Sequence, residues 1–174
     1  MNNGKRTVTN VVFAGLGGLG VLKASDIFAD CAVFDGYDVK KSEIHGMSQR
    51  GGSVTSDVRF GDEVWSPMVP LGEADFLVAF DETQVDHNRP VLREGGLIIT
   101  PERLVGIYGP MNELNEQTLP LTTRNFNVAI LGMLSLHVPF AQDNWEKAIR
   151  ANVPEGTYDQ NLSVFHLGRR FGTE

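Results

Sequence analysis

Glycines gather near the N-terminus, directly after a run of β-branched and aromatic residues. The segment is Gly15-Leu16-Gly17-Gly18-Leu19-Gly20, in which Gly15, Gly17 and Gly20 match the pattern G-x-G-x-x-G. A turn of this kind between a strand and a helix leaves N–H groups free at the helix N-terminus, where the helix dipole favours an anion. We therefore expect the six residues to line a site for a phosphate or a nucleotide. A tight turn that binds nothing is the alternative.

A second unusual segment spans residues 42–54 and contains a histidine, a glutamine, an arginine and three glycines. Core packing does not require this mixture, so we interpret the segment as a polar loop that forms the second wall of a ligand site. An arginine followed by two glycines can present a guanidinium and two backbone N–H groups to a phosphate or a carboxylate. An arginine paired inside the protein is the alternative. The residues expected to face the ligand are Met47, Gln49, Arg50, Gly51 and Gly52.

The residues after the expected second strand bear on which nucleotide would bind. An NAD site carries an acidic residue about 20 residues beyond the glycines, which binds the ribose 2′-hydroxyl. Here Asp38 lies within the strand, and Lys40 and Lys41 follow it. Lysines at this place favour a ribose that carries a phosphate, as in coenzyme A and NADP. Solvated surface lysines are the alternative.

The first glycine segment needs a strand before it and a helix after it. Residues 8–14 predict the strand. Ala24, Ile27, Phe28, Cys31 and Phe34 recur at helical spacing and predict an amphipathic helix. A short strand over 37–40 would complete a β-α-β unit.

The middle of the chain predicts a hairpin. Residues 54–60 alternate apolar and polar side chains, Gly61-Asp62 is typical of a turn, and 63–66 is the expected return strand. A hairpin interrupts the alternation of strands and helices, so we expect a mixed sheet. The later elements expected are strands over 76–80 and 97–100, and helices over 81–93, 126–138, 144–151 and 158–171. The fold class is therefore α/β: a single Rossmann-like, three-layer domain over 1–174, with a mostly parallel sheet and one antiparallel hairpin.

Composition excludes several classes of protein. The 174 residues carry 15 Lys and Arg against 22 Asp and Glu, a net charge of −7, which argues against a nucleic-acid-binding protein. Cys31 is the only cysteine, so the chain cannot form a disulfide framework or hold an iron–sulfur cluster or a thiolate zinc site by itself. We find neither a signal peptide nor an apolar run long enough to cross a membrane, and we expect a cytoplasmic protein.

The two glycine-containing segments together resemble the gamma subunit of 2-oxoacid:ferredoxin oxidoreductases. Within that family the chain is most similar to the small subunit of indolepyruvate oxidoreductase and its aryl-2-oxoacid (phenylglyoxylate-type) relatives. The resemblance covers about residues 8–170. The segments that carry it are Gly15–Gly20, His45–Gly52, Ser66-Pro67, Gly72–Asp75, Gly95–Ile99 and Asn127–Gly132.

The resemblance implies a role within a larger enzyme. Such enzymes oxidatively decarboxylate a 2-oxoacid on thiamine diphosphate, pass electrons through [4Fe-4S] clusters to ferredoxin or NAD, and transfer the acyl group to coenzyme A. Thiamine diphosphate, its Mg²⁺ and the clusters belong to the alpha, beta and delta-type partner subunits. The gamma subunit is implied to contribute coenzyme A binding and subunit packing, and its isolated chain to be inactive. We expect no catalytic acid, base or nucleophile and no metal ligand in this chain.

Two other functions are compatible with the sequence. A stand-alone NAD(P)-binding reductase would use the same glycine turn, although the expected acidic residue is absent and 174 residues leave little room for a substrate domain. A purely structural subunit would keep the turn without a ligand and use the loop around Arg50 as an interface.

Overall fold

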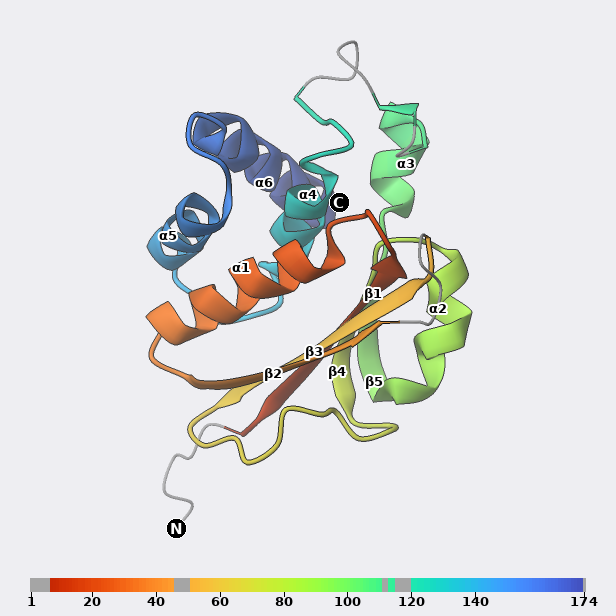
Figure 1. Cartoon of the computed structure of the whole chain (residues 1–174), viewed down its shortest axis with the longest axis vertical. Helices are drawn as coiled ribbons and strands as arrows, with labels where there is room; N and C mark the ends of the chain where they lie inside the picture. The colour runs from red at the N-terminus through yellow and green to blue at the C-terminus, as the bar shows by residue number, and fades with distance from the viewer. Residues whose placement is uncertain (1–6, 46–50, 111–112, 115–119, 174) are drawn as a thin grey trace.

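A computed structural model describes residues 7–45, 51–110, 113–114 and 120–173 (Figure 1). Five strands form one sheet in the order β2-β3-β1-β4-β5. The strands are β1 (Thr9–Leu16), β2 (Asp38–His45), β3 (Ser53–Gly61), β4 (Ala74–Ala79) and β5 (Leu92–Ile99). The helices are α1 (Val21–Phe34), α2 (Thr83–Asn88), the 3₁₀ helix η1 (Arg89–Val91), α3 (Glu102–Tyr108), α4 (Phe126–Leu134), α5 (Gln142–Asn152) and α6 (Tyr158–Thr173).

Strand β3 is the one strand of this sheet that runs against the others. It pairs antiparallel with β1 on one side and with β2 on the other, whereas β4 pairs parallel with both β1 and β5. Four strands therefore point the same way, and the expected α/β fold with a mixed, mostly parallel sheet is confirmed. The expected β-α-β unit is split, because β3 lies between β1 and β2.

The antiparallel hairpin differs from the one expected. It is formed by β2 and β3, and residues 63–66 do not return as a strand. The physical reason is that β1 and β2 already occupy both edges of β3, so no edge remains for a further strand. The chain instead crosses the face of the sheet, where Val64 is buried and its N–H donates to Asp38 Oδ2 at 2.8 Å.

The helix expected over 81–93 is also wrong in its extent. Helix α2 ends at Asn88, and a single 3₁₀ turn containing Pro90 leads directly into β5 at Leu92. Proline has no N–H to donate, so Pro90 cannot form the hydrogen bond that would continue an α-helix at this point. The segment therefore leaves the helix one turn early.

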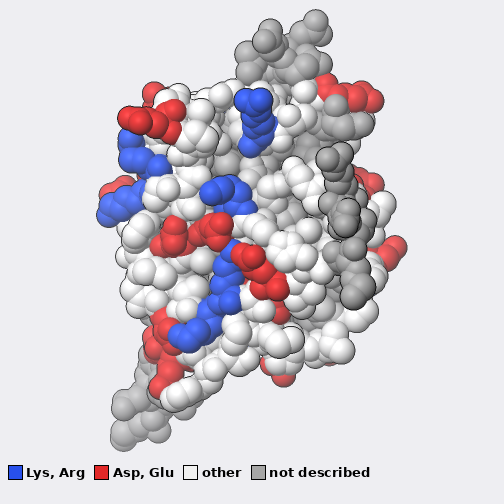
Figure 2. Space-filling model, in the orientation of Figure 1, with Lys and Arg blue, Asp and Glu red and all other residues white. Residues whose placement is uncertain are grey.

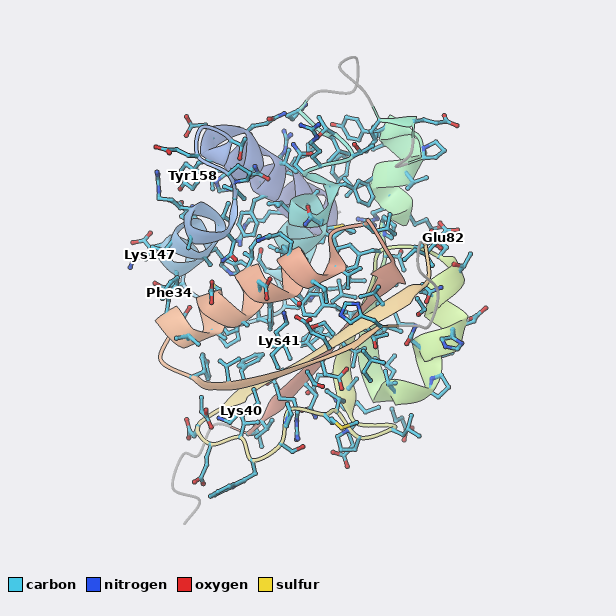
Figure 3. All side chains as sticks on the ribbon, viewed as in Figure 1. Phe34, Lys40, Lys41, Glu82, Lys147 and Tyr158 are labelled. Atoms are coloured by element: carbon cyan, nitrogen blue, oxygen red, sulfur yellow. The ribbon has the colours of Figure 1, made fainter. Side chains whose placement is uncertain are left out.

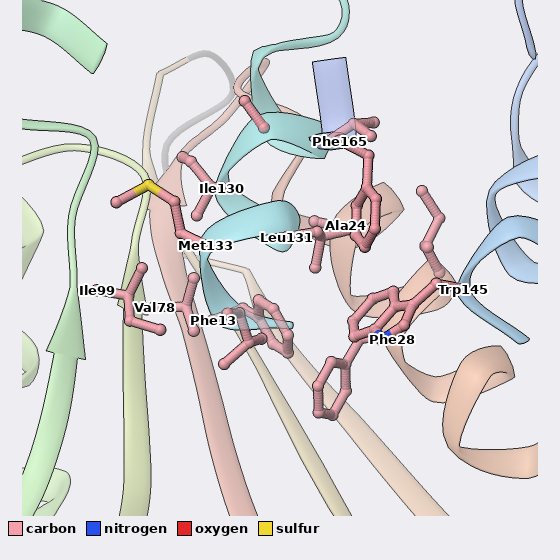
Figure 4. Packing of buried hydrophobic residues seen from close by; sticks show 14 of the residues in the cluster. Phe13, Ala24, Phe28, Val78, Ile99, Ile130, Leu131, Met133, Trp145 and Phe165 are labelled. Carbon is pink, nitrogen blue, oxygen red and sulfur yellow. The ribbon is translucent and has the colours of Figure 1, made fainter. Parts of the chain in front are cut away.

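The main core lies between the sheet and the layer formed by α1, α4, α5 and α6 (Figure 1, Figure 4). The expected stripe on α1 is confirmed for Ala24, Ile27, Phe28 and Cys31, which are fully buried, whereas Phe34 at the helix end is 46% exposed. The ring of Phe28 packs edge-on against those of Phe13 and Trp145. These contacts fix α1, and with it the glycine turn at its N-terminus.

A smaller cluster covers the other face of the sheet. Val12, Ala14, Ala74 and Leu77 are buried there, and Val69, Val91, Leu92 and Ile98 pack against them. This third layer consists of α2, η1 and the connection between β3 and β4. None of the helices in the described ranges is both long and apolar enough to cross a membrane.

Strands β1, β2, β4 and β5 all end at the same edge of the sheet, and β3 begins there. Leu16 at the end of β1 is paired with Ser53, the first residue of β3. In open α/β sheets ligands bind at the carboxyl ends of the strands. This edge is therefore the place to look for a site.

Candidate functional site

The structure brings the two glycine-containing segments into direct contact. The N–H of Gly17 donates to the carbonyl of Gly52 at 2.9 Å. A Cβ on Gly17 would lie 3.4 Å from the backbone nitrogen of Gly51, so a side chain there would press against this segment. The contact follows from the register of β1 and β3, because Leu16 and Ser53 are cross-strand partners. The end of the second segment therefore lies against the turn, and its role as a wall of a ligand site stays a prediction.

Gly18 is the open position of the turn. Its φ is +94°, in the region that favours glycine, and a Cβ built on it would meet no heavy atom of the described part of the chain within 4 Å. Gly15, by contrast, is buried, and a Cβ there would lie 2.6 Å from Cγ2 of Val21 and 3.0 Å from Cβ of Phe80. Gly15 therefore serves packing, and Gly18 leaves space at the surface.

The far end of the turn is tied to α4. The side-chain amide of Asn127 donates to the carbonyl of Gly20 at 3.1 Å, and Asn127 is only 5% exposed. Leu19 packs against the main core. The turn is thus held at Gly17 by Gly52, directly before β3, and at Gly20 by α4, and Gly18 lies between these two anchors.

Helix α1 begins immediately after the turn, and its first N–H groups have no partner within the helix. No side chain among the described residues caps this end, and no acidic residue lies in the first turn. Lys23 occupies the first turn instead, where a cation opposes the positive end of the helix dipole. Free donors and a nearby cation give this end of α1 the chemistry of an anion site.

A pocket of about 390 Å³ lies against the turn. His45, at the end of β2, contributes one wall, and its Nε2 lies 3.7 Å from the carboxylate of Glu43. The pocket is lined by Leu16, Gly17, Gly18, Gly20, Val21, Leu22, Lys23, His45 and Val54.

A larger pocket of about 690 Å³ lies on the other side of Lys23, between the start of α4 and the loop that joins α5 to α6. It brings together a second cation, Arg124, and several side-chain amides. Asn125, Asn127 and Asn161 among these amides are each less than 10% exposed. The two pockets share Lys23, and Asn127, which contacts Gly20, lines the larger one. Together they can receive an elongated, anionic ligand rich in hydrogen-bonding groups.

The lysines on β2 do not converge on the turn. Lys40 lies opposite Arg59 of β3 in the sheet, and Arg59 in turn lies opposite Asn10, near the start of β1. Lys40 is therefore near the other edge of the sheet, five residues before β2 ends at His45. At about 3.3 Å per residue this is roughly 17 Å from the pocket edge of the sheet. The Lys40 ammonium donates to Asp38 at 2.6 Å. The structure thus leaves Lys40 outside the group of residues that it brings together.

Lys41 points to the opposite face of β2, towards α1 (Figure 3). Burial lowers the pKa of Lys41, but hydrogen bonds to Asp26 and Glu43 outweigh it and raise that pKa above its ordinary value. The same hydrogen bond from Lys41 lowers the pKa of Glu43. Figure 2 shows acidic and basic side chains interleaved on the face that carries α1. Lys41 is therefore engaged in internal ion pairs.

Three residues expected at the site, Met47, Gln49 and Arg50, lie outside the described residues. Sequence reasoning did not single out Lys23, Leu22 or Val54 as site residues, and it named Asn127 only as the start of a segment that carries the family resemblance. The signal for Lys23 was its position: a lysine in the first turn of a helix is unfavourable for the helix alone. Within the described ranges, no group of three or more His, Cys, Asp or Glu side chains is placed to hold a metal ion.

Comparison with known proteins assigns the chain to a class. The family model "Pyruvate ferredoxin/flavodoxin oxidoreductase" matches residues 10–171, so the chain belongs to this family. Indolepyruvate oxidoreductase subunit IorB of Thermococcus kodakarensis is 31% identical over 194 residues, which cover 95% of this chain and 96% of that protein. The 2-oxoglutarate synthase subunit KorC of Methanocaldococcus jannaschii is 29% identical, with 92% of both chains covered.

A solved structure gives the same result. The gamma subunit of a keto/oxoacid ferredoxin oxidoreductase from Geobacter sulfurreducens matches with a TM-score of 0.76 and 25% identity, covering 95% of this chain and 98% of that chain. The family and the gamma-type fold expected from the two glycine-containing segments are both confirmed. The chain is a gamma-type subunit of the 2-oxoacid:ferredoxin oxidoreductase class.

Proposed function

We propose that this chain, as a single domain, contributes coenzyme A binding and subunit packing to a cytoplasmic, thiamine-dependent 2-oxoacid oxidoreductase. The reaction is the oxidative decarboxylation of a 2-oxoacid to an acyl-CoA, with electrons passed to ferredoxin or NAD. Aromatic 2-oxoacids are among the candidate substrates. The partners are alpha, beta and delta-type subunits, which hold thiamine diphosphate, Mg²⁺ and the [4Fe-4S] clusters. One cysteine, buried on α1, does not fit a cluster in this chain.

The observation that carries the proposal is the 2.9 Å hydrogen bond between Gly17 and Gly52 beside the open Gly18. It holds the turn in a shape that leaves backbone donors and the N-terminus of α1 facing a pocket. Coenzyme A carries a diphosphate, a 3′-phosphate, an adenine and a long pantetheine arm. A diphosphate suits the turn and Lys23, and the two adjoining pockets provide length for the rest of the molecule.

The role of this chain in the reaction would be to bind and to orient. Backbone N–H groups would hold the phosphates in a fixed position, and Lys23 and Arg124 would neutralise part of their charge. The coenzyme A thiol would then be delivered to the acyl group held by the partner subunits. We assign no proton transfer to His45, whose part is to line the pocket.

The test is an anaerobic affinity purification of the tagged chain from its host, with native mass spectrometry and analysis of thiamine and iron. Larger partners carrying both cofactors, and a rate that saturates with coenzyme A, are the expected result. A panel of indolepyruvate, phenylglyoxylate, 2-oxoglutarate and pyruvate then defines the 2-oxoacid. A lone chain that carries a tightly bound NADP and transfers hydride would contradict the proposal.

Subunit packing without coenzyme A binding would give a different result. The complex would assemble and turn over, but changes at Gly18 or Lys23 would leave the KM for coenzyme A unaltered. The residue at the end of β2 that faces the pocket is His45, rather than the acid with which NAD sites bind the ribose. This favours coenzyme A over NAD as the ligand.

A further inference from the structure

The connection between β3 and β4 carries large apolar side chains on its outer surface. We call residues 62–73 the strap. Within it Trp65 is 85% exposed, Leu71 77% and Met68 57%. Large exposed side chains so close together in one segment are unusual in a protein that functions alone, and tryptophan is enriched among the residues that dominate binding energy at interfaces.

The strap is anchored to the sheet beneath it by its backbone. The N–H of Val69 donates to Asp57 Oδ2 at 2.8 Å, as the N–H of Val64 does to Asp38. Arg59 Nη1 donates to the carbonyls of Ser66 at 3.0 Å and Met68 at 3.2 Å. A segment held in this way has already lost the conformational freedom that a flexible loop would lose on binding.

The anchoring also sets the direction of the side chains. Val64 is 3% exposed, and Val69 packs on the smaller core cluster, so both point into the sheet. Trp65 and Met68 lie between these two valines in the sequence, Leu71 follows them, and all three are left on the outer side of the strap. Burial inward and exposure outward on one anchored segment give a preformed apolar ridge.

Charge indicates the kind of surface that this ridge fits. The strap contains three acidic residues, Asp62, Glu63 and Glu73, and no Lys or Arg. A two-fold contact between two copies of the chain would bring the same acidic patch against itself, which is unfavourable. A surface with basic residues around an apolar cleft complements both the ridge and its acidic ends.

We propose that the strap docks into an apolar cleft bordered by Lys and Arg on a partner subunit of the same enzyme. The proposal rests on the proposed function, since it requires a partner subunit. Trp65 and Leu71 would fill the cleft, while Glu63 and Glu73 would steer the approach. The strap lies on the face of the sheet away from α1, whereas the coenzyme A site lies at the carboxyl edge, so the two can be perturbed separately.

The first test compares the assembly of variants with purified partner subunits. The double variant Trp65→Ser/Leu71→Ser should bind the partners at least about tenfold more weakly, which corresponds to about 1.4 kcal/mol. The control is Ile107→Ser on α3, because Ile107 is 63% exposed and lies outside the strap. Both variants should unfold at the wild-type temperature, since none of these side chains is buried. Equal affinity of wild-type chain and double variant overturns the proposal.

A spectroscopic test locates the contact in the wild-type chain. The protein contains two tryptophans, and Trp145 is fully buried. After labelling with 5-fluorotryptophan, the Trp65 fluorine resonance, assigned with Trp65→Phe, should respond to D₂O in the free chain and lose this response when partners bind. The Trp145 resonance should stay unchanged. A Trp65 resonance that remains solvent-sensitive in the complex, or becomes protected when the chain alone is concentrated, overturns the proposal.

The steering role has its own measurement. Glu63→Gln/Glu73→Gln should lower the association rate with the partners several-fold at low salt and weaken its dependence on ionic strength. If the wild-type chain finds no partner subunit at all, the proposed function fails and the docking role fails with it. If the wild type assembles and the strap variants assemble equally well, only the docking role fails.

Discussion

Replacing Gly18 by alanine separates a ligand-binding role of the turn from a structural one. A Cβ at this position would lie more than 4 Å from every heavy atom of the described residues outside the turn itself, so the change creates no clash with them. The methyl group would instead enter the pocket that Gly18 lines, where we place a phosphate of coenzyme A. The folding cost is limited to backbone strain, because φ is +94°.

The magnitudes follow from these two terms. An alanine in the left-handed region costs about 1–2 kcal/mol, which lowers the Tm of a domain of this size by about 2–8 °C. Losing one hydrogen bond to a charged phosphate costs about 1.5–3 kcal/mol, which corresponds to a roughly 10- to 150-fold increase in the KM for coenzyme A.

Gly36 provides a matched control. It follows α1 with a φ of +82°, and a Cβ there would also lie more than 4 Å from every heavy atom that the structure describes outside the adjoining residues. Gly36 lines neither of the two pockets beside the turn. Gly36→Ala should therefore lower the Tm as much as Gly18→Ala and leave the KM for coenzyme A unchanged. The assay is steady-state turnover of the reconstituted complex at varied coenzyme A, together with thermal unfolding of each chain. Equal KM values for the two variants would refute the ligand role of the turn.

Three further predictions concern charges around the turn and the strap. Lys23→Ala should raise the KM for coenzyme A and yet stabilise the chain by about 0.3–1 kcal/mol, because the lysine opposes the α1 dipole; turnover and thermal unfolding test this, with Lys147→Ala in the exposed part of α5 as control. Glu43→Gln should lower the Tm of the chain at pH 7, because Lys41 holds the pKa of Glu43 below its ordinary value of 4.5 and the ionised carboxylate stabilises the folded state. The difference in Tm between wild type and variant should shrink as the pH falls below 4.5 and Glu43 becomes protonated; a constant difference from about pH 7 to about pH 3 would contradict this. Arg59→Met should destabilise the chain by about 2 kcal/mol, because it removes the hydrogen bonds from Arg59 to Asn10, Ser66 and Met68. It should also speed hydrogen exchange at the amides of Val64 and Val69. The control Arg89→Met, which removes only an exposed i,i+3 ion pair, should have neither effect.

Local patterns in the sequence predicted where the helices and strands lie along the chain better than they predicted which strands are adjacent in the sheet. The stripe from Ala24 to Cys31 identified α1, because burial at helical spacing leaves a periodic trace. The position of β3 between β1 and β2 left no such trace, since an alternating strand of this kind can pair on either side. The return strand expected over 63–66 failed for the same reason: Val64 is apolar and buried, but it is buried against the face of the sheet rather than in a ladder.

The candidate site divides in a similar way. The glycine pattern placed the turn correctly, because the positive φ of Gly18 favours glycine and the close packing at Gly15 leaves no room for a Cβ. Lys40 was predicted to face the ligand by analogy with folds in which the second strand lies next to the first. Here β3 takes that place, and Lys40 lies about five residues away from the pocket edge along β2.

Lys23 shows what local chemistry can add to such patterns. A helix that needed only to be stable would favour an acidic or neutral residue in its first turn. Instead α1 has a lysine in its first turn and a glycine at its N-cap. It therefore has neither an acidic residue that would interact favourably with the helix dipole nor a side chain at the N-cap that would accept a hydrogen bond from the first N–H groups. An anion bound at the turn would supply what they lack. If the turn binds a phosphate as proposed, a less stable helix start in the free chain and affinity for the phosphate both follow from the same arrangement. Lys23→Ala is therefore expected to raise the stability of the chain and to lower its affinity for coenzyme A.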